Sequence, residues 1–290
     1  MTPRAKTPRN SGQRGGHVLR RMRASTVYLL LSIGALVSIA PYLMTLNAAF
    51  KPQSTLLSTQ AWTPAVPATW SNFTALWSQY DMSGFIVHTA VVAGTITLGQ
   101  LVFTTFAAYA FARLDFPGRE PLFWGFIAMM MVPQIVTLIP LFLIMSHLNL
   151  IDTYRALILP YVFGTPYGIF LVRQYFQTIP ADLEAAARID GAGTWTILRR
   201  IMIPLSKPIL ATLATITFVN TWNSLLWPLM ATSSERDEVV TVGIAALQGQ
   251  FASELHILLP AAAVALLPLV AIFLLFQRHI VRSIALTGLK

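Results

Sequence analysis

The chain contains no cysteine and few charged residues. Its 290 residues include 20 Lys or Arg and 11 Asp or Glu, so charged side chains make up only 11% of the sequence. A soluble domain usually has about 25%. The absence of cysteine excludes disulfides, Cys-ligated zinc, iron–sulfur clusters and a thiol nucleophile. Since 55% of the residues are hydrophobic and the mean hydropathy is +0.63, the composition excludes an ordinary water-soluble globule and predicts a membrane protein.

The sequence also lacks the motifs of common catalytic sites. No G-x-x-x-x-G-K-[ST] phosphate-binding loop occurs, so the chain cannot itself supply an ATP site. Its five histidines show no H-E-x-x-H or comparable metal-ligand spacing, and its Ser and Asp residues form no recognisable nucleophile–base pattern. We therefore expect a protein that is not an enzyme and that binds no metal or cofactor itself.

Six runs contain no Asp, Glu, Lys or Arg and are long enough to cross the roughly 30 Å hydrocarbon layer of a bilayer. Their apolar residues are continuous and do not alternate, which favours helices over the strands of a membrane β-barrel. We expect an all-α, polytopic membrane protein with six transmembrane helices. The predicted spans are Val27–Leu46, Phe85–Phe111, Pro121–Ser146, Ala156–Val172, Ile209–Met230 and Ile257–Phe276.

The basic residues lie mostly on one side of these spans. That side holds 17 of the 20 Lys and Arg residues, and the other side holds only Lys51, Arg155 and Arg236. Because cytoplasmic loops of membrane proteins carry an excess of Lys and Arg, the split predicts that both termini are cytoplasmic. The net charge of +9 then follows from topology, so it indicates lipid surroundings and no nucleic-acid partner.

The chain divides into three parts by composition. Residues 1–26, rich in Arg, Pro, Ser and Gly, predict a disordered basic cytoplasmic tail. Residues 27–84 hold the first span and an outer loop with three tryptophans, which suit the membrane interface. Residues 85–290 form the core of the protein, and they include the longest inner loop, residues 173–207.

This inner loop has the pattern of a helical hairpin. Pro180 suits the first turn of a helix, and Gly191 is placed to end that helix in a left-handed conformation. Thr194 can then cap a second helix, which Pro204 and Pro208 end. Such a hairpin either packs passively under the bundle or docks into a cleft of another protein, and its small-residue first helix suits docking.

The same loop carries a family resemblance. Residues 184–192 (EAAARIDGA) and 201–204 (IMIP) resemble the EAA loop of bacterial ABC importer permeases: E-A-A, three residues, Gly, nine residues and I-x-L-P. Segments 107–118 and 276–290 are similar to the carbohydrate-uptake branch, which includes the second maltose-transport permease subunit. The Trp–Asn segment at 222–228 also resembles that branch. The resemblance covers roughly the last two thirds of the chain.

The resemblance implies the fold of a type I ABC importer permease, with an ATPase-coupling segment in the inner loop. The residues that it places there are Glu184, Ala185, Ala186, Asp190, Gly191, Ala192, Ile201 and Pro204. With Asp190 and Gly191 in register, the family's glutamate falls at Ala185, and Glu184 lies one residue earlier, about 100° around the helix. Either Glu184 takes over the role of that glutamate or the acidic contact is dispensable.

By the same resemblance, the chain is the permease subunit of an ATP-driven importer in the bacterial cell membrane. The implied partners are a homologous permease, an ABC ATPase dimer that carries ATP and Mg, and an extracytoplasmic solute-binding protein. The expected solute is a carbohydrate or a related small polar molecule. A secondary carrier for a neutral solute is the alternative, but proton-coupled carriers normally have ionisable residues within their spans.

The polar residues within the predicted spans are neutral. Asn220, Trp222 and Asn223 supply amide and aromatic groups within four residues, and Gln134 in the third span can face them. Such groups suit a neutral sugar, which needs hydrogen bonds and an apolar contact surface. These four residues are the candidate substrate pathway. The alternative is that they form hydrogen bonds between helices.

Overall fold

The computed structural model describes residues 12–56, 62–233, 238–250 and 255–287, and every regular element in these ranges is helical. Three helices contain stretches long and apolar enough to cross a membrane: α1 (Gly12–Ala49), α4 (Met82–Arg113) and α15 (Leu255–Thr287). They contain the first, second and sixth predicted spans. The all-α prediction is therefore confirmed for the described residues.

The other three predicted spans are interrupted. The third is split into α5 (Arg119–Met129) and α6 (Gln134–His147), which are bent by 99°. The fourth is split into α7 (Tyr154–Ile158) and α8 (Pro166–Thr178). The fifth is split into α12 (Lys207–Trp222) and α13 (Leu226–Ala231). By length and composition, the described residues contain three spanning helices, or up to five if two bent helix pairs each form one span. These pairs are Arg119–Met129 with Gln134–His147, and Thr194–Leu205 with Lys207–Trp222, which are bent by 76°.

Proline explains where two of these interruptions fall. Pro133 directly precedes α6, Pro166 is the first residue of α8, and Pro160 lies in the turn between α7 and α8. Proline lacks an N–H group and disfavours helical conformation in the residue before it, so a helix tends to end there. The prediction that Ala156–Val172 is one continuous helix is wrong for this reason.

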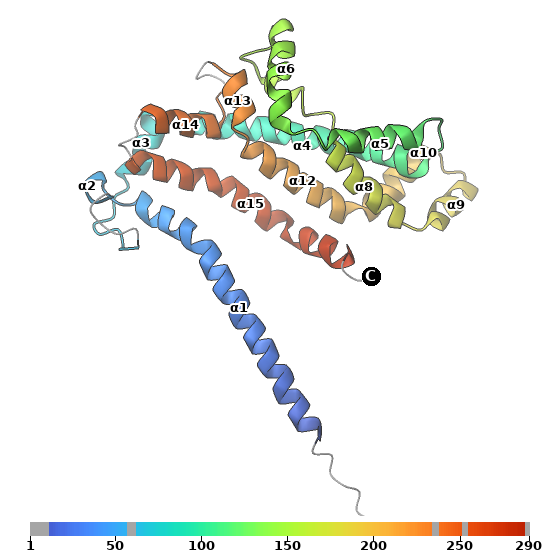
Figure 1. The fold of residues 1–290 in the computed structure, drawn as a ribbon, viewed down its shortest axis with the longest axis horizontal. Coiled ribbons are helices and arrows are strands. Elements are labelled where there is room, and N and C mark those ends of the chain that lie inside the picture. The colour runs from blue at the N-terminus through green and yellow to red at the C-terminus, as the bar shows by residue number, and fades with distance from the viewer. Residues whose placement is uncertain (1–11, 57–61, 234–237, 251–254, 288–290) are drawn as a thin grey trace, which may run out of the picture.

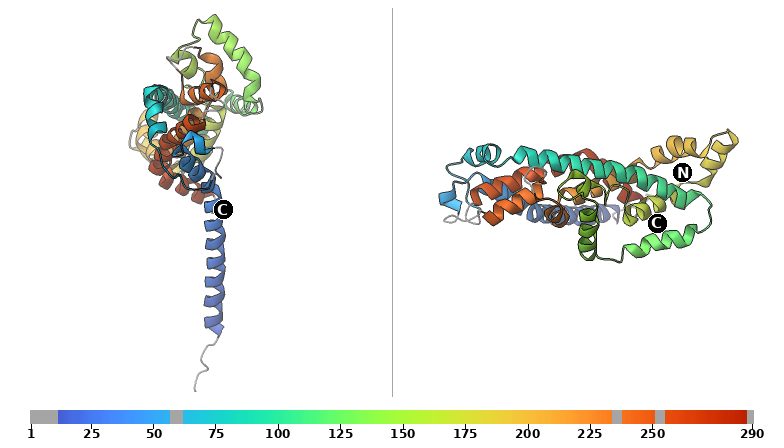
Figure 2. Two further views of the ribbon diagram at one scale, coloured as in Figure 1. Left: turned by 90° about the vertical axis from the view of Figure 1, so that its left-hand side faces the viewer. Right: turned by 90° about the horizontal axis from the view of Figure 1, so that it is seen from above.

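Helices α4, α8, α12 and α15 lie side by side and form the body of the molecule (Figure 1). The C-terminal part of α1 packs against α15, and the N-terminal part of α1 extends away from the body (Figures 1 and 2). It begins at Gly12, so residues 12–26, which we expected to be disordered, are helical in the structure. Extending an existing helix costs much less than nucleating one, so the apolar span continues into the basic segment.

Further short helices lie at the two ends of the body. At one end lie α2 (Gln53–Leu56), α3 (Ser71–Ser78) and α14 (Val240–Gln250) (Figure 1). At the other end lie α9 (Ala181–Ile189) and α10 (Thr194–Ile197), which belong to the predicted hairpin. A π-helical turn, Leu198–Met202, and α11 (Ile203–Leu205) connect this hairpin to α12.

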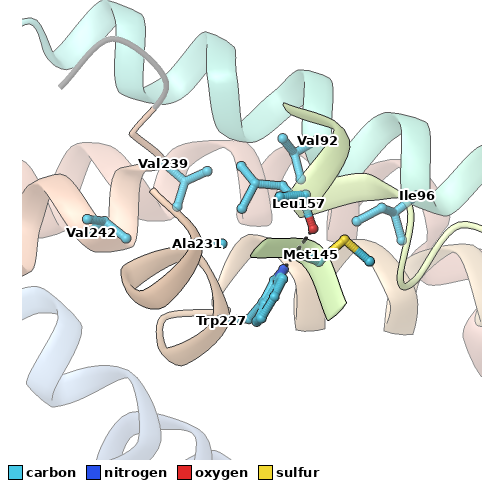
Figure 3. Close-up of a cluster of buried hydrophobic side chains, with 9 residues drawn as sticks. Val92, Ile96, Met145, Leu157, Trp227, Ala231, Val239 and Val242 are labelled. Atoms are coloured by element: carbon cyan, nitrogen blue, oxygen red, sulfur yellow. Dashed lines mark hydrogen bonds between the residues drawn. The ribbon is translucent and has the colours of Figure 1, made fainter. Parts of the chain in front are cut away.

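A buried apolar cluster holds the interrupted helices together near the middle of the body (Figure 3). Trp227 of α13 is 3% exposed, and its Nε1 donates a hydrogen bond to the carbonyl oxygen of Ala156 in α7 at 3.0 Å. Leu157 packs beside Val92 and Ile96 of α4. The helix breaks are therefore fixed by specific packing.

Candidate functional site

A cavity of about 660 Å³ lies where the interrupted helices meet. Helix α4 forms one wall, and the α5–α6 bend, the α7–α8 break and the end of α12 form the others. Small-molecule sites usually measure about 300–1,000 Å³. Non-helical backbone is tolerated at membrane depth where it is buried in protein or lines a cavity. All three helix interruptions contribute to this cavity, which makes it the candidate translocation site.

Gln100, near the middle of α4, holds the α7–α8 break in place. Its Nε2 donates to the carbonyl oxygen of Tyr161 at 2.9 Å, and its Oε1 accepts a hydrogen bond from Thr217 Oγ1 at 3.1 Å. Tyr161 lies in the turn between α7 and α8, where its carbonyl has left the helical pattern. Our pathway residues omitted Gln100. The signal for it was that Gln100 is the one side-chain amide in the predicted span Phe85–Phe111.

Two of the four predicted pathway residues line the cavity together. Gln134 contributes from the α5–α6 bend and Asn220 from α12. The other two do not. Trp222 is 2% exposed, stacks on Phe218, and donates from Nε1 to the carbonyl oxygen of Ala265 in α15 at 3.1 Å.

Asn223 also lies outside the cavity lining, and its Nδ2 donates to the carbonyl oxygen of Val219 at 2.8 Å. Neighbouring residues in a helix point in directions about 100° apart, so closeness in sequence did not place the side chains of 220–223 on one face. Trp222 and Asn223 therefore do not share the cavity face that Gln134 and Asn220 line.

The cavity lining is neutral. None of the described residues that line it is Asp, Glu, Lys, Arg or His. Its polar members carry amide or hydroxyl groups: Thr89, Gln100, Gln134, Tyr161, Thr165, Tyr167, Thr217, Asn220, Thr221 and Ser224. These groups both donate and accept hydrogen bonds, which suits a polyhydroxylated solute without charge.

The predicted hairpin is present, and its turn is built around Gly191. This residue has φ +81°, which confirms the left-handed conformation expected from the sequence. The N–H of Gly191 donates to the carbonyl of Arg188 at 3.0 Å, and that of Ala192 donates to the carbonyl of Ala187 at 2.9 Å. This pair of bonds is a Schellman motif, which satisfies two carbonyls at the end of α9. The cap expected at Thr194 is absent, since Gly193 occupies that position without a side-chain bond.

The second half of the hairpin is anchored to the body. Ile197, Leu198 and Met202 are buried in a cluster with Phe176 of α8 and Leu213 of α12. The π-helical turn lies just before Pro204, which has no N–H to donate. The N–H of the preceding residue, Ile203, donates to the carbonyl of Leu198. Of the two predicted coupling residues here, Ile201 is half-buried and Pro204 is exposed.

The first half of the hairpin presents a small apolar patch on its outer face. Ala185 and Ala186 are exposed, and Ile189 is 87% exposed. Ile189 follows Ala185 by four residues, so both lie on the same side of α9. We call Ala185, Ala186 and Ile189 the hairpin patch. Ile189 was not among the predicted coupling residues, although this four-residue spacing pointed to it.

Glu184 does not share this outer face. It is 7% exposed, and its Oε1 lies 2.9 Å from Nε of Arg113 at the end of α4. The carboxylate therefore points toward the body of the protein. This geometry does not support the possibility that Glu184 replaces the family's glutamate as a direct ATPase contact.

Comparison with known proteins gives a consistent family. Residues 100–286 match the family model described as "Binding-protein-dependent transport system inner membrane component". The chain is 31% identical over 280 residues to the arabinooligosaccharides transport system permease protein of Halalkalibacterium halodurans, covering 94% of this chain and 100% of the relative. It is 28% identical over 270 residues to the diacetylchitobiose uptake system permease protein of Streptomyces coelicolor. This match covers 91% of this chain and 88% of the relative.

A third relative is the sn-glycerol-3-phosphate transport system permease protein of Yersinia pestis, with 31% identity over 265 residues, 89% of this chain and 94% of the relative. Among solved structures, a bacterial ABC transporter involved in the import of the acidic polysaccharide alginate matches with a TM-score of 0.78 and 21% identity. The match covers 94% of this chain and 100% of that chain, so the two share a fold.

Proposed function

Because the chain belongs to the family of binding-protein-dependent transport system inner membrane components, we propose that its cavity carries a neutral oligosaccharide across the membrane. The chain is a permease subunit of an ABC importer, which is a transport component and not an enzyme. The neutral cavity between the interrupted helices is the observation that carries the proposal. The named solutes of two relatives, arabinooligosaccharides and diacetylchitobiose, support it.

The cavity favours a neutral solute over an anion. One relative is named for sn-glycerol-3-phosphate, and one structural match is described by an acidic polysaccharide. An anion removed from water needs a compensating charge or several aligned donors. The described lining of this cavity offers no cationic side chain. A sugar without charge instead needs the amide and hydroxyl groups that are there.

The proposal predicts selective uptake by the purified complex in vesicles. We expect labelled neutral oligosaccharides to be imported at least about tenfold faster than sn-glycerol-3-phosphate. Asn220→Leu should raise KM, because Asn220 lines the cavity. Asn223→Leu is the matched control on the same segment and should behave like the wild type, since Asn223 lies outside the lining. Faster import of the phosphate ester would contradict the proposal.

The proposal includes partner subunits, which the family suggests and for which this chain has exposed surfaces. Apolar residues near the α5–α6 bend are open to the surroundings, among them Met131 at 84% and Ile135 at 65% exposure. We assign this surface to the homologous permease, which completes the pathway. The ATPase dimer, with its ATP and Mg, docks on the hairpin, and a solute-binding protein delivers sugar at the opposite end. We expect this chain itself to bind no cofactor.

The membrane topology belongs to the same proposal. Six crossings, with both termini in the cytoplasm of a bacterial cell, are supported by the six charge-free runs and by the placement of 17 of the 20 Lys and Arg residues on one side. The interrupted helices then cross as broken spans. Residues 85–290 form the permease core, and loop 173–207 faces the cytoplasm.

Ile189→Glu should weaken docking of the ATPase. The hairpin patch is apolar and exposed, so a carboxylate at its centre would be dehydrated on binding. We expect about tenfold less ATPase to co-purify with the permease. Asp182→Asn, on the exposed first turn of the same helix, is the control and should retain the ATPase. Unchanged co-purification of Ile189→Glu would contradict the docking role of the patch.

A further inference from the structure

Arg113 joins three helices at the hairpin end of the molecule. It is the last residue of α4, and its side chain is 13% exposed. Its Nη2 donates to the carbonyl oxygen of Phe176, at 2.7 Å, and to that of Ile179, both at the end of α8. Its Nε faces Oε1 of Glu184 in the first turn of α9. The guanidinium group of this α4 residue thus contacts both the end of α8 and the first turn of α9.

The charges are placed where the helices favour them. Arg113 lies at the C-terminus of α4 beside carbonyls from the end of α8, and Glu184 lies at the N-terminus of α9. Cations are favoured at helix C-termini and anions at N-termini. The Nε–H does not point at Oε1 well enough for a hydrogen bond, so the 2.9 Å contact is a charge pair. Tyr109 donates a long hydrogen bond of 3.4 Å to the other carboxylate oxygen.

Few apolar contacts accompany this ion pair. Of the α9 side chains, Ala187 packs against the apolar cluster beneath the hairpin. A methyl group buries little area, so it resists displacement of the helix weakly. Glu184 is the buried residue of α9. The ion pair is therefore the main attachment of the hairpin's first helix to the body.

We propose that Arg113 and Glu184 act as positioning residues that transmit movement of the hairpin to the cavity; this inference rests on the proposed function. Helix α4 connects the hairpin to the cavity, because Arg113 at its end contacts α9 and Gln100 near its middle lies in the cavity wall. In α8, the connection begins at the carbonyl of Phe176, and Pro166 at the other end of this helix lies in the cavity wall with the capping residue Thr165. A push on α9 thereby reaches two walls of the cavity through one pair of side chains.

A second charged group at the same end provides a control. Glu120 of α5 lies 3.3 Å from Arg173 Nη2 and 3.4 Å from Arg119 Nε, and its side chain is 51% exposed. This group links α5 to α8 and does not include α9. Removal of the Glu120 charge should therefore leave the transmission of movement from the hairpin unchanged.

The test uses the natural absence of cysteine. Ser224→Cys places a single thiol in the cavity wall. In the complete reconstituted transporter, we would measure the rate of thiol modification without nucleotide and with ATP and vanadate, together with ATP hydrolysis. We expect a nucleotide-dependent change in that rate. Glu184→Gln should reduce this change about tenfold, within the usual range of coupling between sites, while ATPase co-purification and hydrolysis continue. Glu120→Gln should leave the change as in the parent.

The outcomes separate this inference from the function beneath it. If Glu184→Gln keeps the full nucleotide-dependent change, the ion pair transmits nothing and the inference is wrong, while the transport function stands. If Glu184→Gln instead loses the ATPase, Glu184 is a docking residue, which also overturns the inference. If the Ser224→Cys parent itself shows no change with nucleotide, ATP does not move the cavity wall; the proposed ATP-driven transport through this cavity then fails, and the inference fails with it.

Discussion

A Gly191→Val permease is expected to enter the membrane but to lose most of its ATP-driven uptake. Gly191 has φ +81°, a conformation in which a β-branched residue is strained. The left-handed conformation costs an ordinary residue about 1–2 kcal/mol. Relief of this strain requires the Schellman turn to open, which redirects α9 and the hairpin patch. We expect uptake to fall by about tenfold or more.

Gly193→Val provides the matched control two residues later. Gly193 has φ −71° and ψ 164°, which is an extended conformation that valine favours. A Cβ atom added at either glycine meets nothing within 4 Å, so crowding is equal and backbone conformation is the difference. The measurements are membrane abundance and uptake in vesicles. Equal uptake by the two variants would show that the direction of the turn does not matter.

Gly99→Val should have the largest effect on folding. A Cβ at Gly99 would lie 2.2 Å from Val162 Cγ2 and 2.7 Å from the carbonyl oxygen of Val162. The side chain of Val162 can rotate away, but its carbonyl belongs to the α7–α8 break. Separation of α4 from that break would also weaken the adjacent bond from Gln100 to Tyr161. Overpacking typically costs about 1–3 kcal/mol, and the lost hydrogen bond adds to this.

The control is Gly94→Val on the same helix, where an added Cβ meets nothing within 4 Å. We expect Gly99→Val to give little folded protein in detergent and a clearly lower unfolding temperature, and Gly94→Val to resemble the wild type. Similar unfolding temperatures for both variants would contradict the close packing of α4 on the α7–α8 break.

Local features were predicted well from the sequence. The left-handed turn at Gly191 depends only on the residues of that turn. Long charge-free runs likewise predicted α1, α4 and α15. In each case the physical cause lies within one segment of the chain.

Features that depend on distant partners were not predictable in this way. The α7–α8 break is stabilised by Gln100, 61 residues before Tyr161. Glu184 stands at helical spacing from Arg188, yet it pairs with Arg113 of another helix. Trp222 resembled a sugar-binding group, but its direction is set by α15, which it contacts through Ala265. Hydrophobic and polar patterns in one segment do not encode which other segment lies opposite.

The central claim is that ATP hydrolysed by partner subunits drives a neutral sugar through this permease. The most direct measurement is sugar uptake by vesicles that contain the complete complex, with the solute-binding protein on one side and ATP on the hairpin side. We predict uptake that requires ATP and is unchanged when an ion gradient is collapsed. Uptake without ATP that follows a proton or sodium gradient would contradict the claim and would identify the chain as part of a secondary carrier.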